Sequence, residues 1–281
     1  MAEGNFFRRL RQLILLLVLL FVATGSYLSR ARSTDWDEPL WITMYPINGD
    51  GLESTSAYID KLETDTFIDI EKFMERETKR YGVDIERPVR IDLGLPVDAQ
   101  PPAPPADGNP IKIAFWSLKL RWWARNITSD QPGARPDIRM FIVYHDPEVR
   151  NSLPHSLGLQ KGMIGVVHSF ANRRQRQVNN FVIAHEMLHT LGASDKYALN
   201  NNRPMFPHGY AEPDNSQRYP QRYAEIMGGR IPLTSSKAVM PNGLLQALVG
   251  PATALEIRWI DSLEKTPVAL DGADGQLASN N

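Results

Sequence analysis

One stretch of the chain, residues 184–195, constrains the fold and the chemistry more than any other. It reads Ala-His-Glu-Met-Leu-His-Thr-Leu-Gly-Ala-Ser-Asp. On a helix, His185 and His189 are four residues apart, so both imidazoles project from one face and can bind one metal ion. Glu186 lies about 100° further round the helix, where it can act as a general base on a water without being a ligand. Gly192 suits the left-handed position that ends a helix, after which Asp195 can return as a third ligand.

Two imidazoles and one carboxylate leave the fourth position of a tetrahedral zinc ion open for water, which is typical of catalytic zinc sites. The chain contains no cysteine, so disulfides and thiolate ligands are excluded. Two other residues are candidates for the third ligand: His208, and Glu225 by analogy with zinc sites that a distant glutamate completes. The ligands that we expect for Zn²⁺ are His185, His189 and Asp195.

The pattern H-E-x-x-H-x-x-G-x-x-D resembles that of the metzincin clan of zinc peptidases, in the variant whose third ligand is Asp. It is locally similar to snapalysin-like and immune-inhibitor-A-like bacterial peptidases, and the continuation Asp195-Lys196-Tyr197 is similar to the latter. The resemblance covers about residues 178–229. It implies a zincin-like fold, peptidase activity and a Met-turn, a tight turn whose methionine lies beneath the metal.

The candidate for the Met-turn is residues 225–229, which read Glu-Ile-Met-Gly-Gly and place Met227 at the turn. Some metzincins have a tyrosine two residues after this methionine, but Gly229 stands there in this chain. No transition-state tyrosine is therefore carried over from that position. Tyr210 and Tyr223, in the irregular segment after Asp195, are the candidates for binding substrate or an oxyanion.

An apolar, leucine-rich run at residues 13–28 follows Arg8, Arg9 and Arg11. Its length is close to the lower limit for a membrane span, and basic residues before a span favour the cytoplasmic side. We expect residues 1–12 to be a short cytoplasmic N-terminus, 13–28 a transmembrane signal anchor and 29–39 a tether. This places a single-pass protein in the bacterial inner membrane with its domain facing the periplasm or the exterior. The alternative is secretion after cleavage of a signal peptide.

Residues 40–265 are expected to form one zincin-like catalytic domain of the α+β class. It contains a twisted mixed β-sheet, the metal-binding helix and a C-terminal helix at 251–260, and residues 266–281 are expected to be a flexible tail. A further helix is predicted over 67–81, ending at Gly82. Hydrophobic patterning predicts strands at 40–46, 89–93, 111–115, 138–144 and 162–170.

Three expectations concern the surface and the cleft. The resemblance implies that the strand at 164–168 is the sheet edge along which a peptide substrate lies, and His168 is a candidate to line the cleft. His145, at the end of the strand at 138–144, is expected to make local hydrogen bonds. The proline-rich segment 96–110 is predicted to be a surface loop. Of the adjacent pair Trp122 and Trp123, we expect one ring in the core and the other half-exposed.

Charge and motif together define the function classes. The net charge of −1 argues against a nucleic-acid binder that relies on electrostatic attraction. We expect a membrane-anchored zinc metallopeptidase with a peptide or protein substrate. The alternatives are a non-catalytic cell-envelope binding protein that keeps the fold, and a zinc amidase that acts on cell-wall peptides. The presence of Glu186 favours catalysis, because a structural metal site does not require that carboxylate.

Overall fold

The computed structural model describes residues 8–17, 20, 24, 35–264, 267, 270–271 and 276–277. Residues 8–17, 20 and 24 are helical. Over these ranges, no helix is both long and apolar enough to cross a membrane. The span expected at 13–28 and the flexible tail expected at 266–281 lie largely outside the described residues, and both stay predictions.

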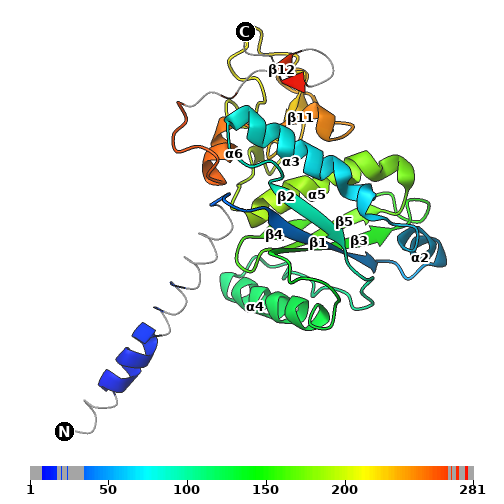
Figure 1. The fold of residues 1–281 in the computed structure, drawn as a ribbon, viewed down its shortest axis with the longest axis vertical. Helices are drawn as coiled ribbons and strands as arrows, with labels where there is room; N and C mark the ends of the chain where they lie inside the picture. The colour runs from blue at the N-terminus through cyan, green and yellow to red at the C-terminus, as the bar shows by residue number, and fades with distance from the viewer. Residues whose placement is uncertain are drawn as a thin grey trace.

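A five-stranded twisted mixed sheet forms the centre of the domain, in the strand order β2-β1-β3-β5-β4 (Figure 1). The first four strands in this order are mutually parallel, and β4 runs antiparallel to β5 at one end of the sheet. The strands are β1 (Leu40–Asn48), β2 (Val89–Leu93), β3 (Ile138–His145), β4 (Leu157–Leu159) and β5 (Ile164–Phe170).

Helices cover both faces of the sheet, which explains why its central strands are almost continuously apolar. Helices α3 (Ile68–Tyr81) and α5 (Arg176–Thr190) lie on one face and α4 (Pro110–Ile127) on the other (Figure 1). Alternate side chains of each strand enter separate cores: in β1, Ile42 and Met44 pack toward α3 and α5, whereas Tyr45 and Ile47 pack toward α4. Each such side chain contributes about 1.5–3 kcal/mol when it is fully buried.

Helix α3 ends as predicted at Gly82, which adopts the left-handed conformation with φ +65°. Two shorter helical elements precede it, α2 (Glu53–Ile59) and the 3₁₀ turn η1 (Thr64–Phe67). The strands predicted at 40–46, 89–93 and 138–144 are present as β1, β2 and β3. The helical spacing and the strand patterns of apolar residues therefore predict most of the elements in this half of the chain.

The strand predicted at 111–115 is wrong, because these residues belong to helix α4. Pro110 occupies the first turn, and the side chain of Asn109 accepts hydrogen bonds from the backbone N–H groups of Ile111 and Lys112. Further along α4, Trp122 is exposed and Trp123 is half-buried, with its ring centroid 4.6 Å from that of Phe141. The ring of Trp123 is thus only partly in the core.

The chain after α5 is mostly irregular and is held together by two-residue strands. A short helix, α6 (Pro251–Glu256), replaces the longer helix predicted over 251–260. The indole of Trp36, in the predicted tether, donates a hydrogen bond of 2.8 Å to Ile257 and packs edge-on against Trp259. The folded unit therefore includes Trp36. The remaining elements are η2 (Arg173–Gln175), β6 (Tyr197–Ala198), β7 (Arg203–Pro204), β8 (Ala224–Glu225), β9 (Ile231–Pro232), β10 (Ala238–Val239), η3 (Leu244–Gln246), β11 (Ala247–Leu248), β12 (Leu270–Asp271) and β13 (Gln276–Leu277).

Candidate metal centre

Helix α5 carries two of the three predicted ligands on the face opposite its apolar face. The helix ends as predicted, because Gly192 has φ +104° and its N–H donates to the carbonyl of His189 at 3.1 Å. This turn brings the chain back toward the helix within a few residues. The side chains that fix the other face of the helix in the core are Ile183, Ala184, Met187 and Leu188.

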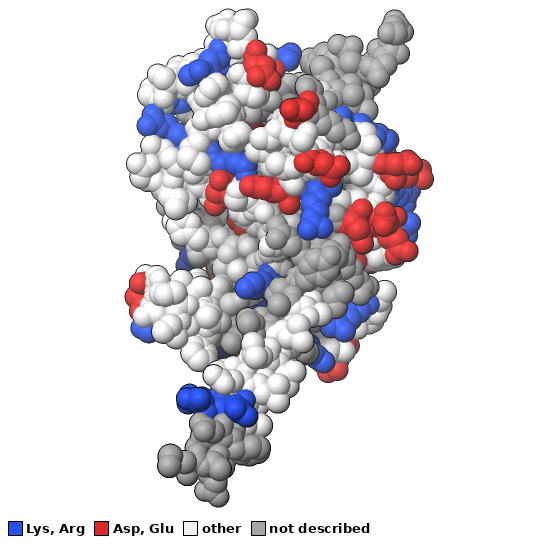
Figure 2. Space-filling view, turned by 90° about the vertical axis from the view of Figure 1, so that its left-hand side faces the viewer, with Lys and Arg blue, Asp and Glu red and all other residues white. Residues whose placement is uncertain are grey.

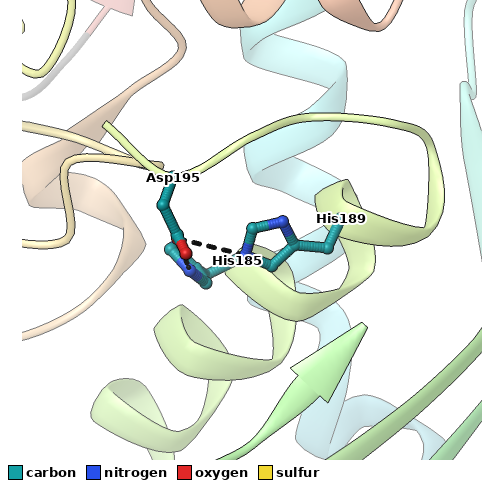
Figure 3. A group of neighbouring side chains, drawn as sticks. All are labelled: His185, His189 and Asp195. Atoms are coloured by element: carbon teal, nitrogen blue, oxygen red, sulfur yellow. Dashed lines mark ion pairs between the residues drawn. The ribbon is translucent and has the colours of Figure 1, made fainter. Parts of the chain in front are cut away.

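His185, His189 and Asp195 come together as one group of possible metal ligands (Figure 3). One oxygen of Asp195, Oδ1, lies 3.2 Å from Nε2 of His185 and 3.2 Å from Nε2 of His189. In a tetrahedral zinc site, ligand bonds of 2.0–2.1 Å separate the ligand atoms by about 3.3 Å. The spacing of the carboxylate from both imidazoles therefore fits a shared ion.

The second nitrogen of each imidazole fixes its tautomer. Nδ1 of His185 lies 2.9 Å from the carbonyl oxygen of Ile226, and Nδ1 of His189 lies 2.8 Å from that of Ala193. A carbonyl oxygen only accepts, so each Nδ1 must carry a proton. When a ring is neutral, its Nε2 therefore has a lone pair that faces Asp195. Two such lone pairs and a carboxylate oxygen that face one point are an arrangement suited to binding a cation.

The pKa values of these groups follow the same logic. Burial alone lowers the pKa of His185, but Asp195 and the charge of Glu186 raise it by more. Although burial works in the opposite direction, the two histidines hold the pKa of Asp195 well below its usual range. In the metal-free chain, a proton on the imidazole of His185 can thus balance part of the negative charge of Asp195 and Glu186.

Glu186 lies beside the ligands with a carboxyl group that is almost fully buried. Burial is the main cause that raises its pKa, and Asp195 adds to the effect while the two histidines oppose it. Its Oε2 atom has no hydrogen-bond partner among the residues that the structure describes. A buried carboxylate with a raised pKa and a free oxygen is suited to accept a proton.

The predicted Met-turn contacts helix α5 through its backbone. The carbonyl of Ile226 accepts the hydrogen bond from His185, and the carbonyl of Met227 accepts one of 2.9 Å from the N–H of Lys196, the residue after Asp195. The side chain of Met227 is fully buried in the core that contains α5. The turn therefore holds both His185 and the backbone next to Asp195 in place.

Sequence reasoning missed Glu256, which holds the loop around Asp195 in place. Its carboxylate accepts hydrogen bonds from the N–H and hydroxyl of Ser194, at 2.9 and 2.6 Å, and from Nζ of Lys196 at 2.6 Å. The residues on both sides of Asp195 are thus bound to the last residue of α6. No sequence pattern links Glu256 to the motif, because the pairing depends on how α6 packs.

The tyrosine that lies near the three ligands is Tyr197, and not Tyr210 or Tyr223 as predicted. The ring of Tyr197 lies 6.3 Å from that of His185, and burial together with the charges of Asp195 and Glu186 raises the pKa of Tyr197 to about 12. Its hydroxyl therefore remains a proton donor at neutral pH. The signal was present in the sequence, since Tyr197 follows Asp195 by two residues.

The two predicted tyrosines have other contacts. The hydroxyl of Tyr210 lies 2.9 Å from that of Tyr219, and burial first, then this neighbour, raises the pKa of Tyr210 to about 12. The ring of Tyr223 is half-buried, and the guanidinium of Arg222 lies 5.5 Å from its centroid. Among the described side chains, neither tyrosine makes a hydrogen bond or ring contact with the three ligands.

The two alternative third ligands lie outside the group. His208 is exposed on the surface. Glu225 is fully buried, and its carboxylate accepts hydrogen bonds from the N–H groups of Gly228 and Gly250, at 2.7 and 3.1 Å, and from Thr253 Oγ1 at 2.7 Å. These bonds tie the Met-turn to the start of α6, which is a structural role.

The prediction that residues 164–168 form the edge of the sheet is wrong. Strand β5, which contains residues 164–168, lies between β3 and β4, and β4 is the end strand. The short β4 escapes pattern analysis because three half-buried residues carry no periodicity. His168 lies in β5, with its Nδ1 3.0 Å from Nε2 of His145, so the two histidines share a local hydrogen bond.

Strand β4 lies directly against helix α5. A methyl group in place of the Gly158 hydrogen would overlap the carbonyl oxygen of Glu186 and would lie 2.6 Å from Cβ of His189. The two backbones approach this closely only because residue 158 has no side chain. The end strand of the sheet therefore packs directly on the turn of α5 that carries Glu186 and His189.

Comparisons with known proteins do not assign the chain to a family. No family model and no curated protein matches it. Among solved structures, it is similar to a chain of one titled "Structure of a chaperone-substrate complex", with 11% sequence identity and a TM-score of 0.33. That match covers 79% of this chain and 34% of the other, so this chain spans about a third of that chain's length. A TM-score this low supports no argument about function.

Proposed function

We propose that this protein is a zinc-dependent peptidase, held at a membrane by its N-terminal segment. The observation that carries the proposal is the position of Asp195 Oδ1, which lies 3.2 Å from Nε2 of His185 and 3.2 Å from Nε2 of His189. Glu186 lies beside this group. Two imidazoles and a carboxylate leave room for a fourth ligand, as catalytic zinc requires. The unpartnered buried oxygen of Glu186 supports catalysis over a purely structural metal.

Each residue of the site has a role in this proposal. His185, His189 and Asp195 would hold zinc, which supplies Lewis acidity that activates water and polarises a carbonyl group. Glu186 takes a proton from the attacking water at its Oε2 atom and then delivers it to the leaving amine nitrogen. Tyr197, with its hydroxyl kept protonated, donates a hydrogen bond to the developing oxyanion.

Strand β4 offers a binding position for the substrate backbone. It is the end strand of the sheet: one of its edges pairs with β5, and no described strand pairs with its other edge. An extended peptide can pair with such an edge by adding a strand. Because β4 contacts the helix backbone at Glu186, a peptide bound there would pass close to the ligands.

The first test is the metal content of the full chain. We expect about one zinc per chain in the wild type, and loss of that zinc in His189→Ala. His208→Ala is the matched control, since it removes an exposed imidazole outside the ligand group. A wild type that takes up no zinc when zinc is supplied would refute the proposed site.

The second test separates catalysis from metal binding. Glu186→Gln keeps the shape of the side chain but removes the base, so we expect zinc to remain while cleavage of a peptide library is lost by a factor of at least about 100. Glu148→Gln, at an exposed position, is the matched control. Zinc binding by a wild type that cleaves no peptide would refute the peptidase activity while leaving the metal site intact.

A further inference from the structure

Helix α4 carries an apolar stripe on its outer face. Ile111, Phe115, Leu118 and Trp122 are 67%, 69%, 54% and 67% exposed. Their spacing of four, three and four residues places them in one row along the helix. A single exposed apolar residue needs no explanation, but a continuous row of four large side chains marks a surface that contacts something apolar.

The stripe is not the face that packs on the sheet. The inward face of α4 is formed by other residues, which include the buried Leu120 and Ala124 and the half-buried Trp116 and Trp123. Among the described helices of residues 35–264, α4 is the one that covers this face of the sheet (Figure 1). The helix is therefore apolar on two opposite faces, and the domain itself uses only one of them.

Basic residues flank the stripe on both sides. At 100° per residue, Lys112 and Lys119 fall on one side of the row, and Arg121 and Arg125 fall on the other. Helix α4 contains these four basic residues and no acidic residue, whereas the whole chain has a net charge of −1. Lys112 pairs with Asp107 at 2.6 Å, and Lys119 and Arg125 are exposed.

One side of the molecule, drawn in Figure 2, shows where charged side chains lie away from α4. On the side of the molecule drawn in Figure 2, acidic side chains gather over the upper half, toward the C-terminal elements. The lower part, at the height of α4 in Figure 1, is mostly uncharged, with a few basic and a few acidic side chains.

We propose that the outer face of α4 lies on the surface of an anionic lipid bilayer. A helix in this position inserts its apolar stripe to the level of the acyl boundary, while flanking Lys and Arg side chains reach the headgroups. Trp122 suits this depth because an indole has both apolar surface and a polar N–H. The absence of acidic residues favours anionic lipid over a zwitterionic surface.

The chain has no cysteine, so a single probe can be placed without removing native thiols. Leu118→Cys, labelled with a nitroxide in the full chain, reports the depth of α4 in vesicles. Leu245→Cys, at a residue that is 72% exposed in η3, is the matched control. In phosphatidylglycerol vesicles, we expect the label at 118 to be accessible to oxygen and protected from an aqueous relaxation agent, and the label at 245 to stay in water. In phosphatidylcholine vesicles, both should stay in water.

A charge variant tests the electrostatic part. Each cation at an anionic surface contributes about fivefold to binding, so Lys119→Glu with Arg125→Glu should lower the ratio of docked to undocked label by at least about 25-fold. Lys61→Glu with Lys237→Glu, both exposed and outside α4, should leave the ratio unchanged.

Three outcomes would overturn the proposal. The first is a label at 118 that stays in water in phosphatidylglycerol vesicles. The second is equal burial of that label in both vesicle types, which would remove the requirement for anionic lipid. The third is dipolar broadening between labels at 118, which would identify a second copy of the chain as the occupant of the stripe.

Discussion

The Nδ1 atom of His185 lies 2.9 Å from the carbonyl oxygen of Ile226, a residue far along the chain in the turn that contains Met227. This bond orients the imidazole and fixes its tautomer, so that Nε2 faces the aspartate. Second partners of this kind commonly change metal affinity by 10–100-fold when they are lost. The position of the turn, and not only the helix, therefore decides whether His185 can act as a ligand.

Met227 should be required for the stability of this turn. Its side chain is fully buried, so Met227→Ala is expected to lower the free energy of unfolding by about 2–5 kcal/mol. Met227→Leu nearly conserves volume and should cost less than about 1.5 kcal/mol. Urea unfolding of the two zinc-free variants measures the difference. Equal stability of the Ala and Leu variants would contradict the packing role.

Glu256 should control zinc affinity without touching the metal. Glu256→Ala removes the acceptor of Ser194 and Lys196, so Asp195 loses its fixed position and zinc affinity should fall about 10–100-fold. Competition with a zinc-binding dye measures this change. Glu212→Ala removes a carboxylate that binds Arg222, and it should leave zinc affinity unchanged. If both variants bind zinc like the wild type, Glu256 does not position the ligand loop.

Gly158 should tolerate no side chain, because Cβ would overlap the helix backbone at Glu186. Gly158→Ala is expected to cost about 1–3 kcal/mol of stability and to weaken zinc binding by displacing the helix turn or β4. Gly51→Ala is the control, because Gly51 has a positive φ of +73° but open space around it. It should cost about 1 kcal/mol and leave zinc binding unchanged. Normal zinc affinity in Gly158→Ala would show that β4 can move away freely.

The pair His145 and His168 should make stability depend on pH. Burial, His145 and the positive charge of Arg150 lower the pKa of His168 to about 4. Its neutral form is thus favoured in the folded state, and the unfolded chain binds more protons between pH 6.5 and 4. Stability is fully present above about pH 6.5 and is lost as pH falls through this window.

His168→Gln measures that contribution. Between pH 7.5 and 5, His168 should account for about 1 kcal/mol of the lost stability, after allowance for solvent screening of a partly exposed ring. The variant's free energy of unfolding should therefore fall less over this range than that of the wild type. His155→Gln is a control at an exposed histidine. Parallel pH profiles for wild type and His168→Gln would rule out the effect.

The sequence by itself determined the local part of the site. Two histidines four residues apart share a helix face, and a glycine that accepts positive φ ends the helix and returns the chain, so the grouping of His185, His189 and Asp195 follows from short-range geometry. Helix α3 and strands β1, β2 and β3 were also predicted from the sequence, because each has enough residues for its pattern of apolar positions to be recognised.

Tertiary packing decided the remainder. Residues 111–115 have apolar spacing that fits a strand, but the cap at Asn109 and a buried face that continues to Ile127 make them helical. Strand β4 takes the edge position because it pairs with β5 across a turn, which no three-residue pattern encodes. Glu256 reaches Ser194 only through the docking of α6. Glu256 and Ser194 are 62 residues apart, so no local pattern links them. The segments that form the start of α4 and strand β4 are short, and their patterns do not specify how they pack on the rest of the fold.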